Sequence, residues 1–179
     1  MTLDDIRQEL EVVKGDIWSQ AAAHGTIPKV YIHWTGGYYE QDFGDYHVGI
    51  HGDGAIVKTR DFDVRPSATW RRNSGSIAIA LDCCYNATPD NLGDYPPTDA
   101  QIEAVSMMVA TVCDVLGIEI NIDNVMTHAE IADIDGYGLY SGDSDCRWDL
   151  LYLYPGDGWG TGGDIIRGKA IWYQQQEAV

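Results

Sequence analysis

The chain has 179 residues, of which 45% are hydrophobic and 11% aromatic, and this length and composition suit one packed domain. The 28 Asp and Glu residues outnumber the 11 Lys and Arg residues, which gives a formal net charge of -17. Because this charge repels phosphate groups, it excludes nucleic acid and an anionic membrane surface as expected partners.

The first half of the chain predicts a helix, a strand and a hairpin. Apolar residues spaced by three and four over 2–23, with a capping pattern at Thr2, predict an amphipathic helix. The β-branched and aromatic run 29–34 predicts a short strand, since a Gly-Gly pair follows it at once. Residues 46–58 predict two strands around a turn at 52–54, where Asp-Gly supplies the positive φ of a tight hairpin.

The second half predicts a buried strand and two further helices. The small and branched apolar run 76–81 is typical of the central strand of a sheet. A helix over 98–117 begins at a Thr and ends at a Gly. Residues 125–128 predict a short strand with a histidine at its end, 133–145 an irregular glycine-rich loop, and 164–175 the last helix.

These elements predict an α/β fold, a single domain in which α-helices flank a central mixed β-sheet. No repeat or linker divides the chain, so we expect an N-terminal helix and lead-in at 1–28, a core at 29–153 and a C-terminal helix at 154–179. The N-terminus lacks the pattern of a secretory signal, and no run approaches the ~18 apolar residues of a membrane span. We therefore expect synthesis in the cytoplasm without a signal peptide.

The cysteines do not predict a disulfide scaffold or a zinc knuckle, because they are few and irregularly spaced. We expect most of them to be reduced thiols in the core: Cys83, Cys84, Cys113 and Cys146.

The histidines are the first candidates for chemistry. His33 and His128 each end a predicted strand, and two imidazoles at neighbouring strand ends can share one metal ion. His47 and His51 are four residues apart in the hairpin and share a face, so a second metal ion is an alternative there. Ordinary packing is the preferred interpretation of that pair.

Five short segments follow one another along the chain: Tyr31-Ile-His33-Trp-Thr, Tyr46-His-Val-Gly-Ile with Gly52-Asp-Gly54, Trp70-Arg-Arg-Asn73-Ser-Gly-Ser-Ile-Ala-Ile, Thr127-His128-Ala-Glu and Gly142-Asp143-Ser-Asp-Cys-Arg-Trp-Asp-Leu150. In this order they resemble the zinc-dependent N-acetylmuramoyl-L-alanine amidases, which include phage-type amidases and peptidoglycan recognition proteins. The likeness spans about residues 29–153. It implies the fold of these amidases and peptidoglycan recognition proteins, with 1–179 as a single catalytic domain.

The resemblance implies one Zn²⁺ per chain, held by His33, His128 and Asp143. Asp143 is the favoured third ligand because the family places an aromatic residue five positions after it, and Trp148 stands there. The alternatives for this ligand are Cys146, followed by Asp145. Three protein ligands leave the fourth tetrahedral position to water, which is the arrangement of a catalytic zinc site.

Tyr46 matches a family tyrosine beside the zinc, so the resemblance implies a catalytic role for its hydroxyl. The chain departs from its relatives at Ala80, where some carry Glu, and at Ser141, where others carry Lys. Glu130 is expected to be a solvated surface residue. Three residues that lead into the central strand are substrate-binding candidates: Trp70, Arg71 and Asn73.

The implied function is hydrolysis of the amide between N-acetylmuramic acid and L-alanine in peptidoglycan or a muropeptide. The alternative from another class is a noncatalytic peptidoglycan-binding module, and a zinc peptidase acting on the stem peptide is a third. We expect a monomeric lysis enzyme of a phage or prophage, an endolysin, that reaches the cell wall through a holin, a secretion system or lysis.

Overall fold

A computed structural model describes residues 1–177, so the last two residues of the segment predicted at 154–179 lie outside it. This part of the chain contains five strands and four helices. In chain order they are α1 (Leu3–Ala22), β1 (Lys29–Trp34), β2 (Val48–Ile50), β3 (Ile56–Lys58), β4 (Ser76–Leu81), α2 (Asp99–Leu116), β5 (Val125–Thr127), α3 (His128–Asp135) and α4 (Thr161–Glu177).

The strands form one mixed sheet in the order β3-β2-β4-β1-β5. β2 and β3 form the predicted antiparallel hairpin, whereas β2, β4, β1 and β5 run parallel. β4 lies in the centre, as its apolar run predicts. The α/β fold with a central mixed sheet is therefore confirmed.

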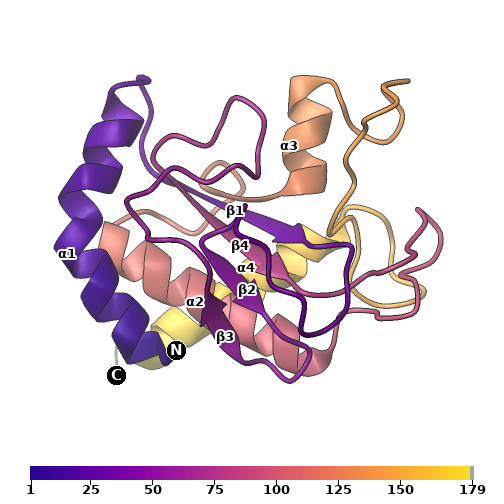
Figure 1. Cartoon of the computed structure of the whole chain (residues 1–179), viewed down its shortest axis with the longest axis horizontal. Helices are drawn as coiled ribbons and strands as arrows, with labels where there is room; N and C mark the ends of the chain where they lie inside the picture. Colours follow the sequence, from indigo (N-terminus) through magenta and orange to yellow (C-terminus); the bar gives the residue numbers. More distant parts are fainter. Residues whose placement is uncertain (178–179) are drawn as a thin grey trace.

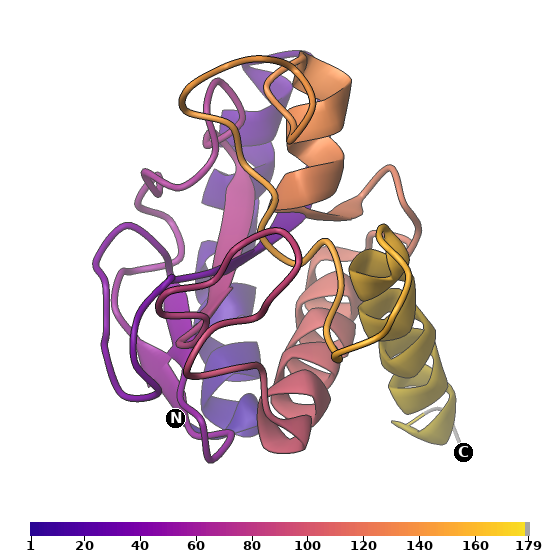
Figure 2. The same ribbon diagram turned by 90° about the vertical axis from the view of Figure 1, so that its right-hand side faces the viewer.

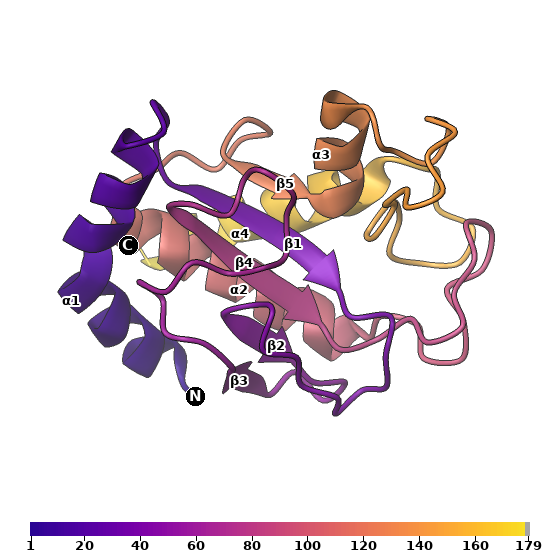
Figure 3. The ribbon, with the colours of Figure 1, turned by 45° about the horizontal axis from the view of Figure 1, so that its top comes forward.

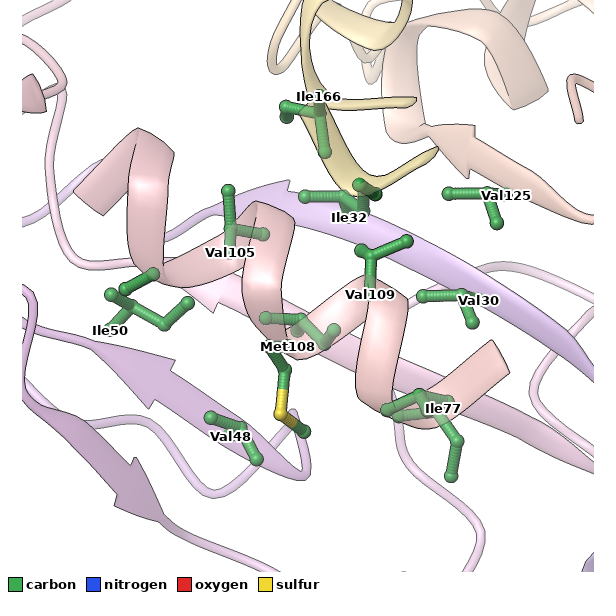
Figure 4. Close-up of a cluster of buried hydrophobic side chains, with 14 of the residues drawn as sticks. Val30, Ile32, Val48, Ile50, Ile77, Val105, Met108, Val109, Val125 and Ile166 are labelled. Carbon is green, nitrogen blue, oxygen red and sulfur yellow. The ribbon is translucent and has the colours of Figure 1, made fainter. Parts of the chain in front are cut away.

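Helices α2 and α4 lie side by side on one face of the sheet, and α1 packs beside α2 (Figures 1 and 2). Val105, Met108 and Val109 of α2 meet apolar side chains of the strands (Figure 4). The predicted capping of α1 by Thr2 is present, and Gly117 ends α2 in the left-handed conformation. None of the helices within 1–177 is long and apolar enough to cross a membrane.

The opposite face of the sheet carries polar and small side chains. In β1, Val30 and Ile32 join the main core with the helices, while Tyr31 belongs to a separate small cluster beside α3. Because side chains alternate along a strand, His33 shares the face of Tyr31. Figure 3 shows the arrowheads of β1 and β4 pointing toward the long loops. The residues that directly follow these two strands, Thr35 and Asp82, are polar.

Helix α3 is the element that the sequence analysis missed. A strand was expected to end at His128 and a loop to begin at 133, but His128 is the first residue of this helix, which continues to Asp135. The signal was present, since Thr127 and Glu130 form a reciprocal capping box and Gly136 ends the helix with positive φ. The interpretation of Glu130 as a solvated residue is also wrong, because its carboxylate pairs with Arg167 at 2.8 Å.

The cysteines are free thiols, as expected. The buried ones are Cys83, Cys84 and Cys113, whereas Cys146 is partly exposed.

Candidate active site

The register of two parallel strands brings the predicted histidine pair together. Ile32 of β1 stands opposite Thr127 of β5, so the next residues, His33 and His128, meet at the carboxyl ends of the strands. Their Nδ1 atoms lie 3.1 Å apart, and both side chains are buried. The two histidines that the sequence singled out are therefore neighbours in the structure.

Asp149 completes the group, although the sequence analysis did not choose it. Its carboxylate oxygens lie 3.1 Å from Nδ1 of His128 and 3.3 Å from Nδ1 of His33. Its backbone carbonyl accepts the N–H of Ala129 at the beginning of α3, which fixes Asp149 beside His128. The three ligand atoms lie within 4.8 Å of one another, so they could hold one metal ion.

Burial and charge set the protonation of this group. Burial lowers the pKa of His33, which favours the neutral imidazole that a metal needs. Burial alone would raise the pKa of Asp149, but the charge and hydrogen bonds of the two histidines outweigh it and hold that pKa well below its usual value. The group thus presents the carboxylate of Asp149 and the neutral imidazole of His33.

A hydroxyl group lies within hydrogen-bond distance of Nε2 in each of the two histidine rings. Thr69 Oγ1 lies 3.1 Å from Nε2 of His33, and the Tyr137 hydroxyl lies 3.3 Å from Nε2 of His128. A hydroxyl that accepts the Nε2 proton leaves the Nδ1 lone pair free, and Nδ1 is the atom that faces the centre of the group.

The structure does not place Asp143 in this group. Its side chain is exposed, and Oδ1 accepts the N–H of Asp145 at 2.8 Å in a turn of the loop. Asp145 is exposed as well, and Cys146 is only partly buried. Asp149 could have been recognised because it directly precedes the apolar run Leu150-Leu-Tyr-Leu, whose burial carries the carboxylate inward.

Tyr46 lies beside the histidines, as predicted. Its ring centre is 5.2 Å from that of His33, and it lines a pocket of about 300 Å³ with Asp149 and Arg147. Burial first, and then the negative charge of Asp149, raise the pKa of the Tyr46 hydroxyl. The phenol therefore stays protonated at neutral pH and can donate a hydrogen bond.

A cleft of about 690 Å³ opens next to the histidines and is lined by Trp70, Arg71 and Asn73. Trp70 is 55% exposed, and the guanidinium of Arg71 lies 4.3 Å from the centre of its ring. Asn73 has a further task, because its side-chain oxygen accepts the backbone N–H groups of Ala68 and Thr69.

Arg147 is a candidate residue that the sequence analysis missed. It lines both the cleft and the smaller Tyr46 pocket, and its positive charge opposes the rise in the pKa of Tyr46.

Ala80 is opposite His33 in the sheet register and offers no polar group. Ser141 Oγ accepts the N–H of Asp143 in the exposed loop. Arg147 is thus a cation beside the site in a chain that lacks the Lys of some relatives.

The family model described as N-acetylmuramoyl-L-alanine amidase matches residues 23–146 of the chain. This match includes His33, Tyr46 and His128, and ends before Asp149. None of the curated proteins matches the sequence.

Several solved structures are similar over part of the chain. The endolysin N-acetylmuramoyl-L-alanine amidase LysCS from Clostridium intestinale URNW is 15% identical over 56% of this chain and 67% of its own, with a TM-score of 0.44. The Ph2119 endolysin from the Thermus scotoductus MAT2119 bacteriophage Ph2119 is 16% identical over 57% of this chain and 71% of its own, with a TM-score of 0.46.

Proposed function

This chain belongs to the N-acetylmuramoyl-L-alanine amidase family, and we propose that it acts with one zinc ion held by His33, His128 and Asp149. The family establishes peptidoglycan amidase activity, which is hydrolysis of the amide between N-acetylmuramic acid and L-alanine. The zinc ion, its ligands and the roles of the neighbouring residues are the proposal.

The spacing of the three ligand atoms is the observation that carries this proposal. A tetrahedral zinc ion with bonds of about 2.0–2.1 Å keeps its ligand atoms roughly 3.3 Å apart. Nδ1 of His33 and Nδ1 of His128 are 3.1 Å apart, and Oδ2 of Asp149 lies 3.3 Å from the first and 3.2 Å from the second. Two nitrogens and one oxygen are also a donor set that catalytic zinc uses. The complete group favours the enzyme over the noncatalytic binding module.

When bound, zinc supplies a Lewis acid that polarises the scissile carbonyl and lowers the pKa of water. Around it, Tyr46 keeps its proton and donates a hydrogen bond from its hydroxyl to the oxygen that becomes negative in the transition state. Arg147 adds positive charge at the junction of the two pockets. These two groups stabilise the oxyanion in the absence of the Glu and Lys of other relatives.

The cleft beside the ligands receives the glycopeptide. We assign the exposed ring of Trp70 to an apolar sugar face and the guanidinium of Arg71 to a carboxylate of the stem peptide. Asp143 lines this cleft although it lies outside the ligand group, so its proposed place is near the substrate.

For the biological setting we propose a monomeric endolysin of a phage or prophage that acts on the cell wall after delivery by a holin, a secretion system or lysis. Peptidoglycan as the substrate supports this setting.

The test is metal analysis of the purified protein together with digestion of purified peptidoglycan and mass spectrometry of the products. We expect bound zinc and stem peptides that begin at L-alanine, with activity lost after chelation and restored by zinc. Full activity in the chelated protein, or release of products cut at another bond, would contradict the proposal.

A further inference from the structure

A second group of possible metal ligands lies at the same edge of the sheet, outside the site described above. Asp42 belongs to the loop after β1, His51 directly follows β2, and Asp82 directly follows β4. One side-chain ligand atom from each of the three lies within 4.8 Å of the others. His51 was one of the two histidines considered for a second metal ion from the sequence.

The other histidine of that pair, His47, does not take part. Its Nδ1 accepts the N–H of Ala78 and its Nε2 lies 3.0 Å from the carbonyl oxygen of Val64, so both ring nitrogens are engaged by the backbone.

The sheet fixes the geometry of the second group. Ile50 pairs with Leu81 in the parallel register of β2 and β4, and the N–H of Asp82 donates to the carbonyl of Ile50. His51 and Asp82 are therefore held next to each other by strand pairing. Nε2 of His51 is 2.9 Å from Oδ1 of Asp42 and 3.5 Å from Oδ2 of Asp82.

Asp82 is a buried carboxylate that lacks a hydrogen-bond partner. It is 0% exposed, and neither of its oxygens has such a partner among the described residues. Nε2 of His51 lies closer to Asp42 than to Asp82. Among residues 1–177, His51 is the one basic side chain within ion-pair distance of the carboxylate of Asp42 or of Asp82. A buried carboxylate without compensation is strongly disfavoured, and burial raises the pKa of Asp82 to about 7.

Gly49 provides the room that the carboxylates occupy. A Cβ at this position would lie 3.1 Å from Oδ2 of Asp82 and 3.3 Å from Oδ1 of Asp42. Both oxygens thus converge above a residue without a side chain. Asp42 is 43% exposed, so the group is open to solvent on one side and an ion has a way in.

We propose that Asp42, His51 and Asp82 form a second binding site for a divalent transition-metal ion. An ion between them would give Asp82 the partner it lacks and would offset the charge of both carboxylates. The imidazole favours zinc, nickel or a similar ion over calcium or magnesium, which bind oxygen ligands. The bound ion would also tie the loop that carries Asp42 to the ends of β2 and β4.

This site is independent of the proposed catalytic zinc, because it shares no residue with His33, His128 and Asp149. The two proposals can fail separately, provided that the metal content of variants in each group is measured in the full chain.

The experiment is equilibrium dialysis of the protein against zinc, followed by metal analysis. We expect two ions per wild-type chain, one after Asp82→Asn, one after Asp149→Ala and none when both substitutions are combined. His51→Ala should also lose one ion while it keeps both carboxylates. Gly49→Ala keeps every ligand but crowds the carboxylates, so it should weaken the second ion selectively.

Two substitutions serve as matched controls because they change exposed residues outside the group: Glu40→Gln in the same loop and His24→Ala after α1. Both should bind as many ions as the wild type. Circular dichroism shows which variants are folded, and His51→Ala decides the question if Asp82→Asn does not fold. A single ion per wild-type chain, or an unchanged metal content in folded His51→Ala, would overturn the second site. An unchanged metal content in Asp149→Ala would instead contradict the catalytic zinc.

Discussion

The hydroxyl of Thr69 lies 3.1 Å from Nε2 of His33, and both side chains are buried. This contact favours the tautomer in which Nδ1 of His33 can bind a metal. Asn73 supports it, because its side-chain oxygen accepts the N–H of Thr69 at 2.8 Å. The segment that was expected to contact substrate therefore also orients a proposed ligand, whereas substrate contact by Asn73 stays a prediction.

Thr69→Val should weaken metal binding by about 10–100-fold, the usual effect of removing a group that orients a ligand. The fold should persist because valine has nearly the same shape. Zinc affinity measured by competition with a chelator checks this. Thr111→Val is the control, since Thr111 is equally buried but bonds to Met107 within α2. Equal affinity in the two variants would remove Thr69 from the site.

Asp149→Asn should abolish amide hydrolysis and zinc binding by the His33 and His128 group, because the amide removes the charge that lies 3.1–3.3 Å from the histidine nitrogens. Asp143→Asn should keep the metal, since its side chain is exposed in the loop. Metal content and peptidoglycan hydrolysis are measured on both variants. If Asp143→Asn loses one ion and all activity while Asp149→Asn keeps both ions, the sequence-based choice of Asp143 is correct.

Tyr46→Phe should retain the metal but lower kcat by about 10²–10³-fold, the effect of removing one donor to an oxyanion. Because the pKa of Tyr46 is raised, its hydroxyl should not limit activity on the alkaline side below pH ~10. Kinetics on a soluble muropeptide separate kcat from KM. Tyr140→Phe, which changes a tyrosine that is 80% exposed, is the control. An unchanged kcat in Tyr46→Phe would exclude this role.

Trp70→Ala should raise KM by about two- to tenfold with little change in kcat, as expected for the loss of one aromatic contact. Trp172→Ala is the matched control, because the two rings are 55% and 54% exposed and Trp172 lies on α4, away from the cleft. Steady-state kinetics on the same muropeptide check the difference. An equal KM in the two variants would argue against sugar binding at Trp70.

His47 should make the protein less stable as the pH falls from 7 to 5. Burial lowers its pKa to about 4, below the value of about 6.5 in the unfolded chain. Between these values the unfolded state binds more protons, so stability rises with pH and falls on acidification, by on the order of 2 kcal/mol at pH 5. Urea unfolding of the wild type and His47→Gln at both pH values measures this. The pH effect should shrink in His47→Gln but not in the exposed control His24→Gln.

The sequence by itself determined the elements with strong local patterns. The capping box at Thr2, the Asp-Gly turn and the apolar run of β4 act within a few residues, so they can be recognised without knowledge of the fold. The pairing of His33 with His128 was also predictable, because His33 lies near the end of one short strand and His128 directly follows another, and both strands end at one edge of a parallel sheet.

Only the tertiary structure decided which acidic groups join these histidines. Asp143 and Asp149 are six residues apart in one loop, and the spacing to Trp148 favoured Asp143, but Asp149 is drawn inward by the buried Leu150 and by its backbone bond to α3. The meeting of His51 and Asp82 likewise depends on the register of β2 and β4. Local periodicity specifies elements, whereas long-range strand pairing and burial select the side chains that share a site.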